Sequence, residues 1–564
     1  MYKQNMEISY SKNNNGDLFE EFKKEENLNM KEVQNYIPIY DLYFSLNENN
    51  FNSINLNQYN RLEGLSLNNK GTVKNELNDL VEKDVFFKFS PLLDPVKYLT
   101  GKYNTEDKNL FNLPKYGIGE CHKKILDKNN SAYVDAFATY LISQLLHRHK
   151  FINGLDYYGS YLGIKKNFEL DIIDDIEYLY ENDYFKNNMD KIFTIDNRIH
   201  EEFINTGSRN NKKHLNISQN TISPKYLNLT DIKDLDEIET LFKECDKDKV
   251  GTDVELMFTS NREHSSNMNK SIARSSSTCS SRTSLTNSDT DSGSYTSEDE
   301  ESGSSCSTAT EDKIMACIKE FPVEVISLEK CENTFDYLLA HNKITNLELE
   351  SAITQILLTL ITYQKVFQLT HNDLHTNNIM YIKTDIKFLY YKYKNVCYKV
   401  PTYGKIFKII DFGRAIYKYN DVFLCSDSFH PKGDAATQYN IEPYFNENKP
   451  RLGPNMSFDL CRLGCSMYDF IVEDINDDIK KYSKIEQIIL NWCYDDKGRN
   501  ILYKNNGSER YPEFKLYKMI TRLVHNHTPE KVFDDPFFSK FFVKNKIGKK
   551  QASLMDIDNY PVCV

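Results

Sequence analysis

Long apolar runs are absent from this 564-residue sequence, since no stretch approaches the roughly 18 residues that a membrane-spanning helix requires. Residues 1–15 are polar and lack the apolar centre of a signal peptide. The 12 cysteines include no C-x-x-C pair, and Cys461 and Cys465, one helical turn apart in an apolar segment, are expected in the core. These absences argue against a membrane or secreted protein and predict a cytoplasmic chain with reduced thiols.

An excess of positive charge is also absent. The 70 Lys and Arg residues against 82 Asp and Glu give a formal net charge of −12. Such a chain would repel the phosphate backbone, which argues against a nucleic-acid partner. A basic protein partner, or one that offers Ser or Thr, is easier to accommodate. Nothing in the composition indicates an oligomeric state.

The sequence is organised around the stretch His371–Asn378, which follows a helix predicted over residues 347–367 and precedes a predicted strand at 379–381. Within it, Asp373 and Asn378 lie in a turn between helix and strand. An acid at this place can accept or orient a hydroxyl proton, and an amide oxygen can hold a metal ion. The spacing therefore favours phosphoryl transfer.

A second acidic residue follows the strand predicted over residues 405–410, which ends in Asp411-Phe412-Gly413. The Asp411 carboxylate would supply another hard oxygen ligand for Mg²⁺. These two motifs in this order resemble the catalytic core of protein kinases, and more closely the divergent kinase-like proteins of giant DNA viruses. The resemblance covers residues 84–164 and 314–540. It implies an α+β, two-lobed fold with a small antiparallel-sheet lobe and a mainly helical large lobe.

The resemblance also implies an activity, which is transfer of the γ-phosphate of ATP, with Mg²⁺, to Ser or Thr of a protein substrate. Asp373 would orient the acceptor hydroxyl or take its proton, and Asn378 and Asp411 would hold the metal ion. His375 stands where Ser/Thr kinases usually place Lys against the γ-phosphate, and some atypical kinases also carry His there. A viral member of this family would act in the host cytoplasm or in the virion.

For the small lobe, the strand predicted over residues 84–90 carries Lys88, which resembles the lysine that holds the nucleotide phosphates. The residue two positions earlier is usually small, whereas here it is Phe86. A helix is predicted from Ser131 as its N-cap, and Asp135 on it resembles the carboxylate that pairs with the lysine. Aspartate is one methylene shorter than the usual glutamate. No glycine-rich phosphate loop is evident before Lys88.

A hinge between the lobes is expected after two predicted strands at residues 314–318 and 323–328. The resemblance implies that backbone groups of Glu329 and Cys331 bind adenine and that Leu328 guards the back of the pocket. In the large lobe, His371 is expected to bury its ring, and Asp459 resembles the acid that braces the catalytic loop. Asn372 replaces the Arg that clamps a phosphorylated loop in regulated kinases, which predicts that no such switch exists.

The predicted organisation has six parts. An irregular extension over residues 1–54 precedes the first part of the small lobe at 55–164, and an insertion follows at 165–313. From about residue 260 the insertion is rich in Ser and poor in large apolar residues, which predicts disorder. The last strands and hinge at 314–331, the large lobe at 332–545 and a tail at 546–564 complete the chain.

Two other functions remain open. A small-molecule kinase could share the same Asp and Asn pattern, although the helices predicted near the end of the large lobe favour a protein kinase. A pseudokinase scaffold is suggested by Phe86, by Asp135 and by the missing glycine loop. Stabilisation of the protein by ATP in the presence of Mg²⁺ would separate the scaffold from the two enzymes.

Overall fold

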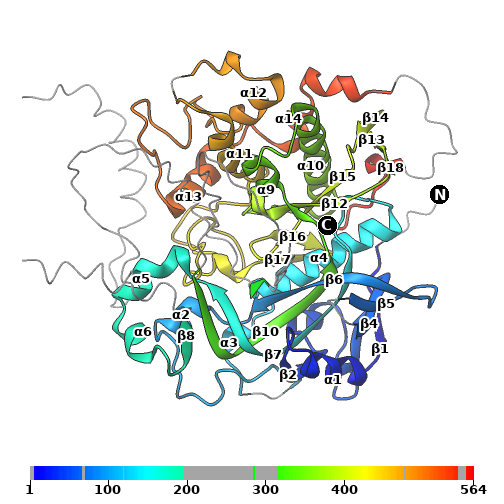
Figure 1. Cartoon of the computed structure of the whole chain (residues 1–564), viewed down its shortest axis with the longest axis vertical. Helices are drawn as coiled ribbons and strands as arrows, with labels where there is room; N and C mark the ends of the chain where they lie inside the picture. Colours follow the sequence, from blue (N-terminus) through cyan, green and yellow to red (C-terminus); the bar gives the residue numbers. More distant parts are fainter. Residues whose placement is uncertain are drawn as a thin grey trace, which may run out of the picture.

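The computed structural model describes residues 6–66, 70–117, 120–195, 284–285, 314–475, 477–543 and 554–564. The chain is a mixed α+β protein in which a half rich in strands meets a half rich in helices (Figure 1). Of the segment predicted to be disordered, only β9 (Ser284–Leu285) is described, and it pairs with β6. The rest of that prediction lies outside the described residues.

The strand-rich half contains an eight-stranded sheet whose main path runs β2-β7-β10-β6-β5-β4, with β8 added on β10 and β9 on β6. All pairings in this sheet are antiparallel. The strands are β2 (Met30–Gln34), β4 (Asn60–Ser66), β5 (Lys70–Asn75), β6 (Leu80–Pro91), β7 (Tyr157–Asp171), β8 (Phe193–Ile195) and β10 (Met315–Glu329).

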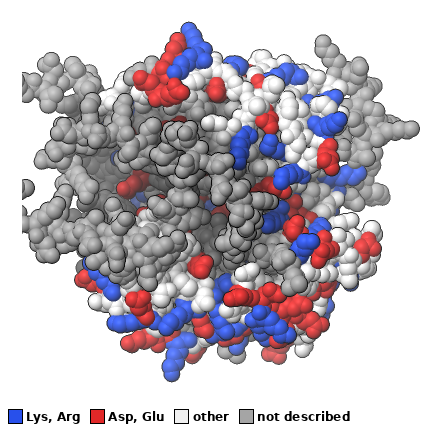
Figure 2. Space-filling model, in the orientation of Figure 1, with Lys and Arg blue, Asp and Glu red and all other residues white. Residues whose placement is uncertain are grey.

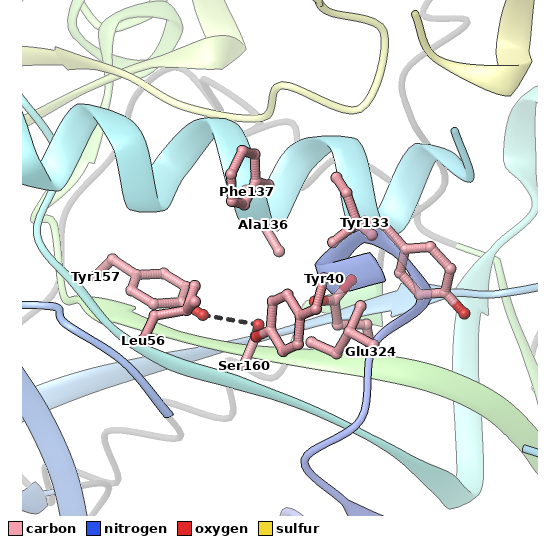
Figure 3. Close-up of a pocket in the computed structure, with 10 residues that line it drawn as sticks. Tyr40, Leu56, Tyr133, Ala136, Phe137, Tyr157, Ser160 and Glu324 are labelled. Atoms are coloured by element: carbon pink, nitrogen blue, oxygen red, sulfur yellow. Dashed lines mark hydrogen bonds between the residues drawn. The ribbon is translucent and has the colours of Figure 1, made fainter. Parts of the chain in front are cut away.

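Helix α4 (Ser131–Arg148) packs on this sheet and buries residues all around its first three turns. Its N-cap is Asn130, whose side chain accepts a hydrogen bond from the Ala132 amide, so the cap lies one residue before the predicted Ser131. A small cavity lies between α4 and the sheet, and Glu324 of β10 and Tyr40 line it with Tyr133 of the helix (Figure 3). Glu324 is fully buried, and neither of its carboxylate oxygens accepts a hydrogen bond from the described residues.

The N-terminal segment is ordered, so the prediction of an irregular extension over residues 1–54 is wrong. It contains an amphipathic helix, whose Leu18, Phe19 and Phe22 are buried, and β2 joins the main sheet as an edge strand beside β7. Short apolar pieces too small to signal structure alone become stable here because the sheet offers them a surface. The elements are β1 (Tyr10–Lys12), α1 (Gly16–Lys24), η1 (Pro38–Leu42), η2 (Phe51–Ser53) and β3 (Ile54–Leu56).

Two further boundaries differ from the prediction. The boundary predicted at residue 164 falls within β7, which continues to Asp171 with Phe168 and Leu170 buried. The two strands expected around residues 314–328 form one continuous strand, β10. Pro322 lies within it, next to the position where its neighbour β6 ends, because Val323 pairs with Pro91, the last residue of β6. A proline is tolerated there because its missing N–H lies on the side where β6 ends, while its carbonyl still accepts the Leu92 amide at 2.9 Å. Two short helices lie between β6 and β7 in the chain, α2 (Pro95–Leu99) and α3 (Lys123–Leu126). Between β7 and β8 lie η3 (Ile173–Asp175), α5 (Ile176–Glu181) and α6 (Asp183–Asn188).

The helix-rich half is built around α10 (Asn346–Phe367), which starts with a capping box of Thr345 and Glu348 and is buried along most of its length. The other helices are α9 (Phe335–Ala340), α11 (Phe458–Ile471), α12 (Lys484–Asn491), α13 (Phe514–Leu523) and α14 (Pro529–Phe533), with the short η5 (Thr376–Asn378), η6 (Asp427–Phe429), η7 (Ile479–Lys481) and η8 (Pro536–Phe541).

Small sheets accompany these helices. One runs β11-β12-β15, one is the hairpin β16-β17, and in a third β18 pairs in parallel with β13. The predicted tail at 546–564 therefore ends in ordered structure, because Met555 and Ile557 are fully buried. The strands are β11 (Asn333–Thr334), β12 (Ile379–Lys383), β13 (Phe388–Tyr393), β14 (Val396–Pro401), β15 (Lys405–Ile409), β16 (Ile416–Tyr419), β17 (Val422–Cys425) and β18 (Leu554–Asp556), and η9 (Ile557–Asn559) follows.

The surface carries both signs of charge. On the face in view, Lys and Arg side chains are interspersed with Asp and Glu over the strand-rich half (Figure 2). Among the described residues, none of the helices combines the length and apolar character that crossing a bilayer would require.

Candidate active site

The stretch His371–Asn378 is held by helix α11. The two carboxylate oxygens of Asp459, on the first turn of this helix, accept the backbone amides of His371 at 2.9 Å and Asn372 at 2.8 Å. The His371 ring is fully buried, contacts the Phe412 ring and hydrogen-bonds the carbonyl of Ile410 at 2.9 Å. These bonds fix the backbone of the stretch on both sides, as expected for His371 and Asp459.

Asn372 adopts a left-handed conformation (φ 63°), which asparagine tolerates better than most residues. Its amide nitrogen donates to the carbonyls of Thr370 and Arg414, at 3.1 and 3.0 Å, and its oxygen accepts from the Tyr439 hydroxyl at 2.6 Å. Every polar group of this side chain therefore has a partner within the fold.

Asp373 is almost completely buried, with 2% of its surface exposed. Its Oδ1 accepts the Tyr517 hydroxyl of α13 at 2.7 Å, while its Oδ2 lies 3.6 Å from the Arg414 guanidinium. Oδ2 accepts no hydrogen bond from the described residues, although it is buried. Burying a carboxylate oxygen without a hydrogen bond costs folding free energy. A bound group that donates a hydrogen bond to this oxygen would recover that free energy.

His375 lies in the same buried region. Its Nδ1 accepts the Asn377 amide at 3.3 Å, which leaves Nε2 to carry the proton. Nε2 is buried and has no hydrogen-bond partner among the described residues. Burial lowers the pKa of His375 to about 4, against the opposing effect of Asp373, so the ring is a neutral hydrogen-bond donor near pH 7.

Asn378 and Asp411 stand at the ends of two paired strands. Asn378 precedes β12, Asp411 follows β15 and one intervening residue, and the amide of that residue, Ile410, donates to the Asn378 carbonyl at 3.0 Å. The Asn378 amide nitrogen donates to the Asp373 carbonyl at 2.9 Å, so its oxygen is the atom left to bind a ligand. Pairing of β12 with β15 thus brings together two oxygen donors that are 33 positions apart.

Lys88 of β6 connects the strand-rich half to this site. Its Nζ lies 2.6 Å from Asp135 of α4 and 3.0 Å from Asp411, and its side chain is 8% exposed. Burial alone would lower the pKa of Lys88, but the two carboxylates raise it, so the lysine is charged. The other oxygen of Asp135 accepts the Phe412 amide at 2.7 Å. Asp135 therefore reaches both partners despite being shorter than glutamate.

The segment that follows Asp411 is tied to α4 at a second point. Asp427 accepts the Ser131 amide at 3.0 Å and forms an ion pair with Lys124, while its own amide donates to the Asn129 carbonyl at 2.7 Å. A carboxylate at a helix N-terminus stabilises the helix. Asp427 thereby holds the end of α4 that lies one turn before Asp135.

The residues expected at the hinge, Leu328, Glu329 and Cys331, differ in how many contacts hold them. The Glu329 carboxylate pairs with Lys408 and accepts the Asp156 amide at 2.7 Å, so this side chain fastens β10 to its neighbours. The Glu329 amide donates to the Asp156 carbonyl at 3.0 Å. The Cys331 amide takes part in none of the hydrogen bonds between described residues, and burial raises the pKa of its thiol to about 12. Leu328 is buried opposite the half-buried Phe86 across the β10–β6 pair.

Several residues of the site were not predicted from the sequence. They are Tyr517, Arg414, Asp427 and also Arg462, which lies on the same helix as Asp459; all contact predicted residues or their supports. The hairpin β4–β5 precedes Lys88 in the sheet, but residues 67–69 at its turn lie outside the described residues, as do Ile118 and Gly119.

The site offers two oxygen donors suited to a metal ion. The described residues contain no group of three or more His, Cys, Asp and Glu side chains placed to hold a metal ion. The Asn378 amide oxygen and the Asp411 carboxylate are hard oxygen donors, and Mg²⁺ is commonly bound by one or two protein oxygens with water and substrate phosphates as the remaining ligands. These two residues fit such an ion.

No protein-family model and no curated protein matches the sequence.

Proposed function

We propose that this protein transfers the γ-phosphate of ATP, with Mg²⁺, to Ser or Thr of a protein, and that its two halves are the lobes of a protein-kinase-like fold. The observation that carries the proposal is the position of Lys88, whose ammonium lies within 3.0 Å of both Asp135 and Asp411. These three residues come from three separate segments. A charged lysine beside a metal-binding acid suits the phosphates of a nucleotide.

The roles of the remaining residues follow from their hydrogen bonds. Asp373 Oδ2 is available to orient an acceptor hydroxyl and take its proton. Neutral His375 offers its Nε2 proton to a phosphate oxygen. Mg²⁺, held by Asn378 and Asp411, would neutralise charge on the phosphates. The rate would depend on positioning and on these fixed charges.

A scaffold that binds nucleotide without transferring phosphate is the second candidate. The observation that favours it is the burial of Asp373 and His375, which are 2% and 3% exposed, so that little of either side chain is open to an acceptor in this conformation. The resemblance to viral kinase-like proteins supports the enzyme. A cytoplasmic or virion location and a Ser- or Thr-bearing protein partner are part of the same proposal.

The test is a pair of measurements on the full-length protein. The first is the shift in melting temperature on adding ATP with and without Mg²⁺, and the second is transfer of labelled phosphate to a mixture of Ser- and Thr-containing peptides. Lys88→Met should weaken nucleotide binding and transfer, whereas Asp385→Ala, at an exposed site, should change neither. Mg²⁺-dependent stabilisation without transfer would support the scaffold, and absence of both would refute the proposal.

A further inference from the structure

Tyr517 bridges the proposed catalytic acid and a buried arginine. Its hydroxyl donates to Asp373 Oδ1 at 2.7 Å and accepts from Arg462 Nε at 2.8 Å. Tyr517 is 2% exposed, and its ring stacks on Phe514 and contacts Phe458. The Tyr517 side chain is therefore held at both ends, because its ring is packed between aromatic neighbours and its hydroxyl makes one hydrogen bond as donor and one as acceptor.

Two cations lie close to the Tyr517 ring. The guanidinium of Arg462 lies 5.2 Å from the centre of the Tyr517 ring and that of Arg414 lies 5.6 Å from it. Burial nevertheless raises the pKa of Tyr517, so the hydroxyl keeps its proton and acts as the donor to Asp373. The direction of this hydrogen bond is thus determined.

The consequence for Asp373 is an asymmetry between its two oxygens. Oδ1 is occupied by Tyr517, whereas Oδ2 is buried, has no hydrogen bond from the described residues and faces Arg414 at 3.6 Å. Rotation of the carboxylate would break the Tyr517 bond. The oxygen left for an acceptor hydroxyl is therefore always the same one, at the same orientation.

We infer that Tyr517 is a positioning residue for phosphoryl transfer, which holds Asp373 through Oδ1 so that Oδ2 meets the acceptor hydroxyl. This inference rests on the proposed function. Nothing in the sequence around Tyr517 indicates such a role, because the contact joins residues 144 positions apart. The opposite possibility, that the Tyr517 hydroxyl occupies the acceptor's own place, predicts the opposite change in rate.

The experiment compares Tyr517→Phe with the wild type in transfer to a Ser-containing peptide mixture. Phenylalanine keeps the packed ring and removes only the hydroxyl. We expect kcat to fall by about tenfold to a hundredfold, the range for losing one hydrogen bond to a charged group, while KM for the peptides and the ATP affinity change less than about threefold. Tyr560→Phe is the matched control, since its buried hydroxyl has no hydrogen-bond partner among the described residues.

A second comparison separates positioning from a purely structural effect. In the Asp373→Asn background, Tyr517→Phe should change the residual rate by less than about threefold, because no carboxylate remains to be oriented. Arg462→Lys, which removes the donor to the Tyr517 hydroxyl but keeps the charge, should lower kcat in the same direction as Tyr517→Phe. It provides a second test should the phenylalanine variant fold poorly.

The outcomes are distinct. An active wild type whose kcat is unchanged by Tyr517→Phe overturns the inference and leaves the proposed function standing. A higher kcat or a lower KM also overturns it, and would mean that Tyr517 competes with the acceptor. A folded wild type that binds Mg²⁺ and ATP but transfers no phosphate overturns the proposed function and, with it, the role of Tyr517.

Discussion

Replacing Glu324 by Gln should stabilise the protein, and increasingly so as the pH rises. Glu324 is a carboxyl with 0% exposure, enclosed between β10, α4 and the N-terminal segment, and neither oxygen accepts a hydrogen bond from the described residues (Figure 3). Burial raises its pKa well above the ordinary value of 4.5, so the folded protein keeps the proton. Glutamine has the same shape and never carries the charge.

The direction of this pH dependence follows from the number of protons that each state binds. The unfolded chain releases the Glu324 proton above about pH 4.5, whereas the folded chain retains it. Because the folded state then binds one more proton, its stability falls by about 1.4 kcal/mol for each pH unit between the unfolded and folded pKa values. From pH 5.5 to 7.0 the advantage of Glu324→Gln should therefore grow by about 2 kcal/mol, provided that the carboxyl stays protonated in the folded protein.

Thermal denaturation of the two proteins at a series of pH values measures this difference. The gap in melting temperature should widen by a few degrees over that interval. Glu320→Gln is the control for a partly exposed carboxylate on the same strand, where Glu320 pairs with Lys31. A gap between Glu324→Gln and the wild type that stays constant with pH would show that Glu324 binds protons equally in both states, which would refute the reasoning.

Further predictions concern the site and its control. Asp373→Ala should abolish transfer with little change in ATP affinity, because the residue meets the acceptor, and an equal loss of ATP binding would exclude that role. Asp411→Ala should remove Mg²⁺-dependent nucleotide binding, and unchanged Mg²⁺ dependence would contradict the assignment. Deleting residues 260–312 should change the melting temperature little, since loop entropy grows slowly with length and, of the described elements, the deletion removes the two-residue β9 alone; a large drop would show that the segment packs. Phosphatase treatment should leave the rate within about twofold, and a fall of about a hundredfold would mean that a phosphate controls the site.

The parts of the fold with strong periodicity could be predicted from the sequence. Helix α10 begins at Asn346 where residue 347 was expected and ends at Phe367 as predicted, because its apolar spacing is regular over many turns. The mixed α+β architecture with antiparallel sheets is likewise confirmed. The N-terminal segment could not be predicted, because its short apolar pieces depend on the sheet they cover.

For the site, the resemblance implies the contact of Lys88 with Asp135 and that of Asp459 with the catalytic stretch, but not the side-chain partners of Asp373. His371 and Asp373 are close in the chain, so their shared turn is a local property. The side-chain partners of Asp373, by contrast, are Tyr517, which the packing of α13 brings near, and Arg414, which lies in the segment after Gly413. Glu324 looks like an ordinary polar position within a strand, and its lack of partners depends on the helix that covers it.

The link between Asp427 and the start of α4 has a consequence for how such a protein could be controlled. In a switch that depends on phosphorylation, negative charge arrives at this kind of place and can be removed again. Here the charge is part of the polypeptide, paired with Lys124 and bonded to the Ser131 amide. The joint between the two halves therefore needs no added phosphate, because its negative charge belongs to Asp427 itself. Under the proposed function, the cell would set the amount of activity through the number of copies made and degraded.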